Sequence, residues 1–116
     1  MAGDLPTALE SFVLSNLRSL EHLDALLALY REPSRWWTGR TVSQAIGTSV
    51  PTADQILEDL CSANLLGVRV SSSIAYQFNP GSPEIQRLVT EFIEALRGGR
   101  QKISTLITDR RSFHTR

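Results

Sequence analysis

Several features that commonly reveal a protein's function are scarce in this 116-residue chain. It has a single cysteine, so it has no internal disulfide, and this suits a reducing compartment. Its twelve basic and twelve acidic residues cancel, so there is no overall positive field of the kind that draws proteins onto DNA. No apolar run approaches the roughly 20 residues that span a bilayer, and no basic-then-apolar signal opens the chain. We therefore expect a soluble, cytoplasmic protein with no membrane span.

Residues that would carry catalysis or bind a metal are equally sparse. His22 and His114 have no metal-ligand spacing, and each is interpreted as a lone surface histidine. Cys61 is expected to be a small packed thiol. No serine lies in a strand-turn-helix elbow between glycines, and no glycine-rich loop is present to hold a phosphate. The sequence therefore predicts no enzyme, no catalytic residue, no metal site and no cofactor.

What the chain does contain is two short helical patterns across a tight turn, followed by two short strand patterns. The first helical pattern carries its apolar side at Val42, Ala45 and Ile46. Gly47 then supplies the left-handed residue that ends a helix, because it has no Cβ to clash there. The elements expected here are helices over 38–46 and 50–64 and strands over 68–70 and 74–78.

Helical patterns also flank this central region. A helix is expected over 6–17, and Ser19 is placed to cap the next helix, which Pro33 ends. Residues 35–37 fit a short strand that pairs with the hairpin. Ser82 and the proline after it mark the start of a last apolar helix.

The whole order is helix, helix, short strand, helix, helix, hairpin and long helix, and it resembles the winged helix-turn-helix regulators of the MarR type. The most specific element is the run Leu57-x-x-Leu60-x-x-Ala63-Asn64-Leu65-Leu66, which is similar to that family's second-helix ending. The resemblance implies a mainly α (α+β) fold, in which a three-helix core carries a small β-hairpin wing and flanking N- and C-terminal helices. It divides a single domain into an N-terminal flanking helix (1–18), the winged helix-turn-helix unit (19–80), and a C-terminal helix with a basic tail (81–116).

The same resemblance implies a bacterial, dimeric transcription regulator whose partner is double-stranded DNA. Gln55 on the second helix can pair with adenine, and Glu58 or Asp54 can accept from cytosine. Arginines near the start of the first helix and in the hairpin would contact phosphates, which serine hydroxyls can also do. The DNA-binding candidates are Arg35, Arg40, Ser49, Thr52, Gln55, Arg69 and Ser72.

The charge of the second helix opposes that expectation. With Leu60 at the centre of the buried face, the neighbouring buried positions are Ala53, Ile56, Leu57, Ala63 and Asn64. The outward positions are Pro51, Thr52, Asp54, Gln55, Glu58, Asp59 and Ser62, which include three carboxylates and no arginine or lysine. Carboxylates are repelled by a phosphate backbone. Two further hypotheses therefore stay open: a winged helix repurposed for binding another protein, and a module whose basic segment 97–116, with a net charge of +5, touches an anionic membrane or partner helix.

The flanking segments predict a homodimer. Their apolar residues exceed what a small three-helix core can cover, and pairing two chains would remove that surface from water. The residues expected at this interface are Leu9, Phe12, Val13, Leu88, Phe92 and Leu96.

Overall fold

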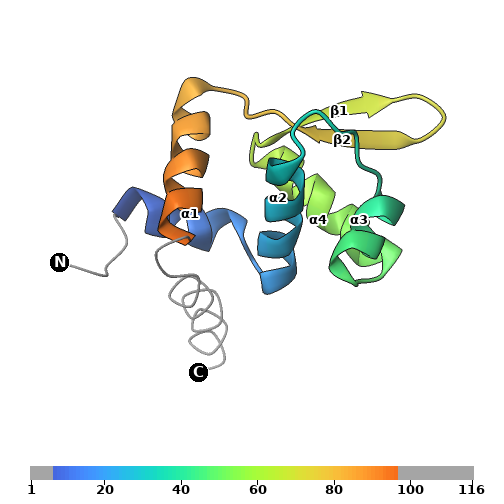
Figure 1. Cartoon of the computed structure of the whole chain (residues 1–116), viewed down its shortest axis with the longest axis horizontal. Helices are drawn as coiled ribbons and strands as arrows, with labels where there is room; N and C mark the ends of the chain where they lie inside the picture. The colour runs from blue at the N-terminus through green and yellow to red at the C-terminus, as the bar shows by residue number, and fades with distance from the viewer. Residues whose placement is uncertain (1–6, 97–116) are drawn as a thin grey trace.

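A computed structural model describes residues 7–96, with only the backbone described for residues 7–10. The elements are α1 (Thr7–Asn16), α2 (Leu20–Arg31), α3 (Gly39–Ile46), α4 (Val50–Ser62), β1 (Leu66–Val70), β2 (Ile74–Phe78) and a last helix over residues 83–96. Figure 1 shows α2, α3 and α4 grouped beneath the hairpin, while the last helix, drawn in orange, stands across α1 at the opposite end. The predicted fold class, a mainly helical core with a hairpin wing and flanking helices, is confirmed.

The two central helices begin and end where local chemistry requires. Thr38 and Thr41 form a capping box, in which each side-chain oxygen accepts the other residue's backbone N–H. Gly47 ends α3 in the left-handed conformation, at φ 75°. Ser49 then caps α4 by accepting the N–H of Thr52 at 3.2 Å. The turn between the helices is therefore fixed by residues within it.

The hairpin forms a two-stranded antiparallel sheet. Its register runs from Leu66 opposite Phe78 at the core end to Val70 opposite Ile74 at the tip. Residues directly opposite each other share a face of the sheet, so Leu66, Phe78, Val70 and Ile74 all lie on one face. That face is buried at the core end and exposed at the tip. The hairpin thus projects outward from the helical core as a wing (Figure 1).

The strand expected over residues 35–37 is reduced to a single bridge. Trp37 and Tyr76 exchange backbone hydrogen bonds of 2.6 and 2.7 Å, and no third strand is assigned among the described residues. The carbonyl of Ser34 accepts a further hydrogen bond from the Gln77 side chain. This segment nevertheless ties the start of α3 to the wing, as the prediction required.

The apolar stripes of the flanking helices are covered within one chain. Val13 and Phe92 are fully buried, and the Phe12 and Phe92 rings lie 5.7 Å apart, so α1 packs directly against the last helix. Leu96 is buried as well, and Leu88 is half-buried. The premise that these residues need a second chain to cover them is wrong, because the last helix folds back onto α1. The dimer itself stays a prediction; the side chain of Leu9 lies outside the described residues.

Asn64 was expected on the buried face of the second helix, and that expectation is wrong. The helix ends at Ser62, and Asn64 is exposed with a left-handed φ of 68°. Asparagine tolerates this conformation better than most residues, and here it turns the chain from α4 into β1.

Candidate nucleic-acid interface

The three carboxylates of α4 are not equally exposed. Gln55 and Glu58 are exposed, as are Asp54 and Ser62. Asp59, which the helical pattern placed outward, is only partly exposed because its carboxylate turns toward α2. Two of the three carboxylates, Asp54 and Asp59, lie against other parts of the chain.

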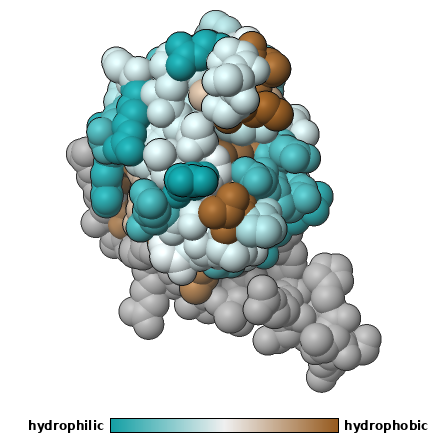
Figure 2. Space-filling view, turned by 90° about the vertical axis from the view of Figure 1, so that its right-hand side faces the viewer, coloured by the Kyte–Doolittle hydropathy of each residue, from teal (hydrophilic) through white to brown (hydrophobic). Residues whose placement is uncertain are grey.

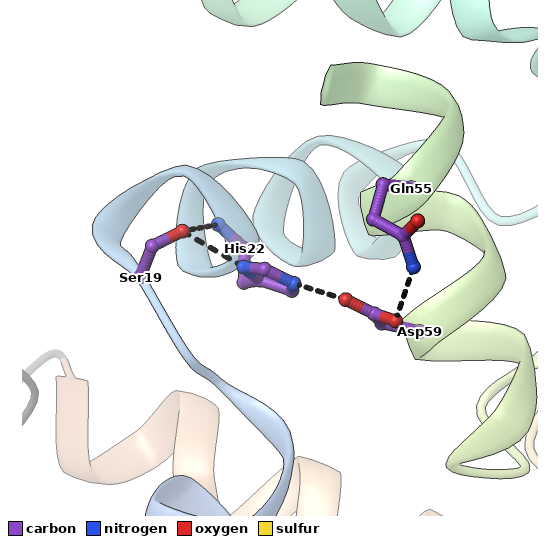
Figure 3. Close-up of polar contacts among 4 residues, drawn as sticks. All are labelled: Ser19, His22, Gln55 and Asp59. Atoms are coloured by element: carbon purple, nitrogen blue, oxygen red, sulfur yellow. Dashed lines mark hydrogen bonds and ion pairs between the residues drawn. The ribbon is translucent and has the colours of Figure 1, made fainter. Parts of the chain in front are cut away.

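Asp59 belongs to a row of polar side chains that joins α2 to α4 (Figure 3). His22 Nε2 lies 2.9 Å from Asp59 Oδ2, and His22 Nδ1 lies 2.8 Å from the hydroxyl of Ser19. On its other side, Asp59 Oδ1 accepts a 2.9 Å hydrogen bond from Gln55 Nε2. His22 is buried, with 7% of its surface exposed, so its interpretation as a lone surface histidine is wrong. The cause is the packing of the first turn of α2 onto α4, which brings together residues 37 positions apart.

The charge state of Asp59 follows from its partners. Burial alone would raise the pKa of this carboxyl. Hydrogen bonds from His22 and Gln55, with the charges of His22 and Arg18, outweigh burial and lower the pKa of Asp59 below its ordinary value. An ionised carboxylate only accepts hydrogen bonds, so His22 Nε2 must carry a proton, an assignment drawn from the bonding pattern.

Asp54 lies against the start of α3. A Cβ built on Gly39, the first residue of α3, would fall 1.8 Å from Asp54 Oδ1 and 2.7 Å from its Cγ. The carboxylate therefore occupies space that only glycine leaves open. It also sits at the positive end of the α3 dipole, where a negative charge is stabilised. Of the three acidic side chains on α4, Glu58 alone has no such described contact with another helix.

A groove of about 450 Å³ separates the wing from α3 and α4. Arg40 lines it from α3, Asp54 and Glu58 line it from α4, and Ile74 and Tyr76 line it from β2. Figure 2 looks onto this end of the molecule, where apolar surface gathers over the wing among hydrophilic side chains. The groove thus combines one positive charge, two negative charges and an apolar wall.

Two of the predicted arginines are stacked on the tryptophan pair. The Arg35 guanidinium carbon lies 3.8 Å from the centre of the Trp37 ring, and that of Arg69 lies 4.3 Å from the Trp36 ring. Such cation–π contacts hold an exposed guanidinium in place. Arg35 also lies 3.4 Å from Glu32, in an exposed pair.

The predicted basic residues do not converge on one face of the wing. Ile74 and Tyr76 share a face and line the groove together with Arg40. Arg69 lies opposite Ala75, and therefore on the other face. A ligand bound in the groove would therefore contact Arg40, whereas a ligand on the opposite face of the wing would contact Arg69.

The remaining DNA-binding candidates lie around the same end of the molecule. Ser49 is exposed at the start of α4, and its hydroxyl donates to Thr52 Oγ1 at 2.9 Å, so both side chains already have local partners. Ser72 is exposed at the wing tip, and three exposed apolar residues flank that tip: Val68, Val70 and Ile74. Sequence periodicity did not single out this apolar tip, because alternation alone does not tell which end of a strand leaves the core.

Further features of the described residues concern membrane, metal and thiol chemistry. No helix between residues 7 and 96 is long and apolar enough to cross a membrane. The same residues hold no group of three metal-binding side chains. Cys61 is half-buried, with its thiol 3.8 Å from the carbonyl of Leu66. The basic segment 97–116 lies outside the described residues.

Comparison with known proteins supports the fold. No protein-family model matches the chain, and no curated protein matches it in sequence. A solution structure from Mycobacterium bovis is similar, with a TM-score of 0.53, 19% identity, and coverage of 87% of this chain and 96% of that one. It is the homodimeric winged helix-turn-helix DNA-binding domain of a possible ArsR-family transcriptional regulator. The chain therefore has a winged helix-turn-helix fold; a MarR-type identity stays a prediction.

Proposed function

We propose that this protein is a winged-helix DNA-binding protein that acts as a homodimeric transcription regulator. The observation that carries the proposal is the exposed outer face of α4, on which Gln55 presents an amide while the Asp59 carboxylate is hydrogen-bonded to His22 and Gln55. Asp59 keeps its negative charge, but its hydrogen bonds with His22 and Gln55 hold the carboxylate within the chain. The similarity to a homodimeric DNA-binding domain supports the same function.

Phosphate contacts in this proposal come from the arginines around the wing and α3. Arg35 and Arg69 are held by Trp37 and Trp36, so little side-chain freedom is lost when either meets a phosphate. Arg40 is exposed beside α4 and can reach a backbone that follows the groove. Because the proposed phosphate contacts come from Arg35, Arg40 and Arg69, the salt dependence of binding is shallow. Each neutralised phosphate adds about 0.9 to the slope of log affinity against log salt.

The direct test is fluorescence anisotropy with duplex DNA from upstream of the protein's own coding sequence and with a random duplex, at low and moderate salt. We expect measurable binding at low salt and a shallow salt slope. Arg40→Ala and Arg69→Ala should weaken binding to both duplexes alike, because phosphate contacts carry no sequence information. Arg87→Ala, which removes the same charge from an exposed position on the last helix, is the matched control and should change binding least.

A second candidate function is the binding of another protein. The apolar residues Val68, Val70 and Ile74 are exposed beside a groove that carries Asp54 and Glu58, and this combination suits a basic, partly apolar partner. Failure of the chain to bind either duplex at low salt would favour this function over DNA binding.

A further inference from the structure

We propose that His22 and Asp59 are positioning residues that fix the side-chain amide of Gln55 for reading one base pair. This inference rests on the proposed DNA-binding function. It adds to that function a residue, His22, that lies on α2 and outside the helix-turn-helix pair α3–α4.

Gln55 Nε2 donates a hydrogen bond to Asp59 Oδ1, one turn further along α4. A glutamine–aspartate pair four residues apart on an exposed helix is by itself a weak contact. Here the acceptor is not free to move, because Asp59 Oδ2 is held 2.9 Å from His22 Nε2. His22 is held in turn, since it is buried and its Nδ1 lies 2.8 Å from Ser19, the residue that caps α2. Figure 3 shows the resulting row of three side-chain contacts from the cap of α2 to the surface of α4.

The row decides which way the amide of Gln55 faces. Because ionised Asp59 only accepts hydrogen bonds, it must face the NH₂ group of Gln55 and not its carbonyl. The 2.9 Å bond uses one of the two N–H donors. One N–H donor and the carbonyl acceptor remain, and this is the pair that a glutamine uses to bind adenine N7 and N6 in the major groove.

Fixing the amide has two consequences for reading. A free exposed glutamine can rotate its amide by half a turn and then offers donor and acceptor in the opposite order. The bond to Asp59 opposes that rotation, so a single order is presented before DNA arrives. Less side-chain entropy is then lost on binding, and discrimination against the wrong base rises.

The first measurement needs no DNA. Side-chain amide resonances of Gln55 are compared by NMR with those of Gln44, an exposed glutamine on α3 that serves as the matched reference. We expect the two Gln55 N–H protons to differ more in chemical shift and to exchange more slowly with water than those of Gln44. Asp59→Ala and His22→Ala should move Gln55 toward Gln44, whereas His22→Gln, which keeps an N–H donor at a similar reach, should restore part of the difference. Gln55 resonances that match those of Gln44 in the wild-type protein would overturn the proposal.

The second measurement is selection of binding sites from a random duplex pool, read by sequencing. Good bidentate contacts discriminate between bases by roughly 5-fold to more than 100-fold. Gln55→Ala should remove that preference at an A·T pair, and Asp59→Asn and His22→Ala should reduce it at the same pair. When Asp59→Asn or His22→Ala is combined with Gln55→Ala, the double variant should show no further loss of preference at that A·T pair. Glu21→Gln removes the same charge as Asp59→Asn from an exposed position next to His22, and it should leave the preference unchanged.

The selection tests the positioning role of His22 and Asp59 separately from the DNA-binding function. A loss of preference spread evenly over all positions in Asp59→Asn and His22→Ala, or one that adds to the loss in Gln55→Ala, would show a merely structural role and overturn the proposal. No enrichment of any sequence by the wild-type protein at low salt would overturn the proposed function, and the reading role with it. In that case the NMR comparison still decides whether His22 and Asp59 hold the amide.

Discussion

Replacing Phe92 by alanine distinguishes two roles for this residue: packing in the core of one chain, or contact with a second chain at a dimer interface. Phe92 is fully buried in one chain, and its ring lies 5.7 Å from that of Phe12 at an interplanar angle of 56°. Removing a buried phenylalanine side chain costs about 3–5 kcal/mol of folding stability. Loss of the tilted aromatic pair is about 0.5–1.5 kcal/mol of that sum. Since a domain is typically stable by about 5–15 kcal/mol, Phe92→Ala should remove a large fraction of the total.

The assay is urea denaturation followed by circular dichroism at two protein concentrations, with sedimentation run in parallel. We expect a large fall in the urea midpoint at both concentrations. Leu88→Ala, on the same helix but half-buried, is the matched control and should cost clearly less. A Phe92→Ala protein that unfolds at the wild-type midpoint but sediments as a monomer beside a dimeric wild type would refute the reasoning, because Phe92 would then be covered by a second chain.

Two further perturbations test local features. Gly47→Ala should destabilise the protein by about 1–2 kcal/mol, because φ is 75° and a left-handed residue with a Cβ is strained, although the Cβ itself would meet nothing within 4 Å. Gly47→Asn should cost less, since asparagine tolerates the left-handed conformation better. An unchanged melting temperature in Gly47→Ala would contradict the left-handed conformation of Gly47. Asp59 has a lowered pKa in the folded chain, so the stability it contributes is complete above its ordinary pKa of about 3.9 and is lost as the pH falls through the lowered value. Asp59→Asn should therefore flatten the loss of urea resistance below about pH 4, and mutant and wild-type curves that run parallel through this range would count against the pairing.

Features fixed by neighbouring residues could be predicted from the sequence. The cap at Ser19 and the left-handed Gly47 depend on backbone groups within five residues, so their chemistry is visible in a short window. The hairpin strands and the buried face around Leu60 follow from periodicity, which reports which side of an element is covered.

Periodicity does not report what covers that side. The stripe that includes Phe92 was assigned to a second chain, yet α1 covers it. His22 and Asp59 meet only because α2 and α4 cross at that point, and Asp54 meets Gly39 only because α3 and α4 do. Such contacts depend on helix packing angles, which composition and spacing within one helix do not determine.

The acidic face of α4 also has a consequence for selectivity. Binding to arbitrary DNA comes almost entirely from phosphate contacts, and Asp54, Glu58 and Asp59 weaken that contribution wherever α4 approaches a backbone. This repulsion acts at every sequence, whereas contacts to base edges are short-ranged and are gained only where the donor and acceptor order matches. An amide held by Asp59 joins both effects in one helix, because the carboxylate that repels phosphate also orients the group that reads the base. Weak binding to random DNA is therefore what this surface should give even when its specific site is bound well.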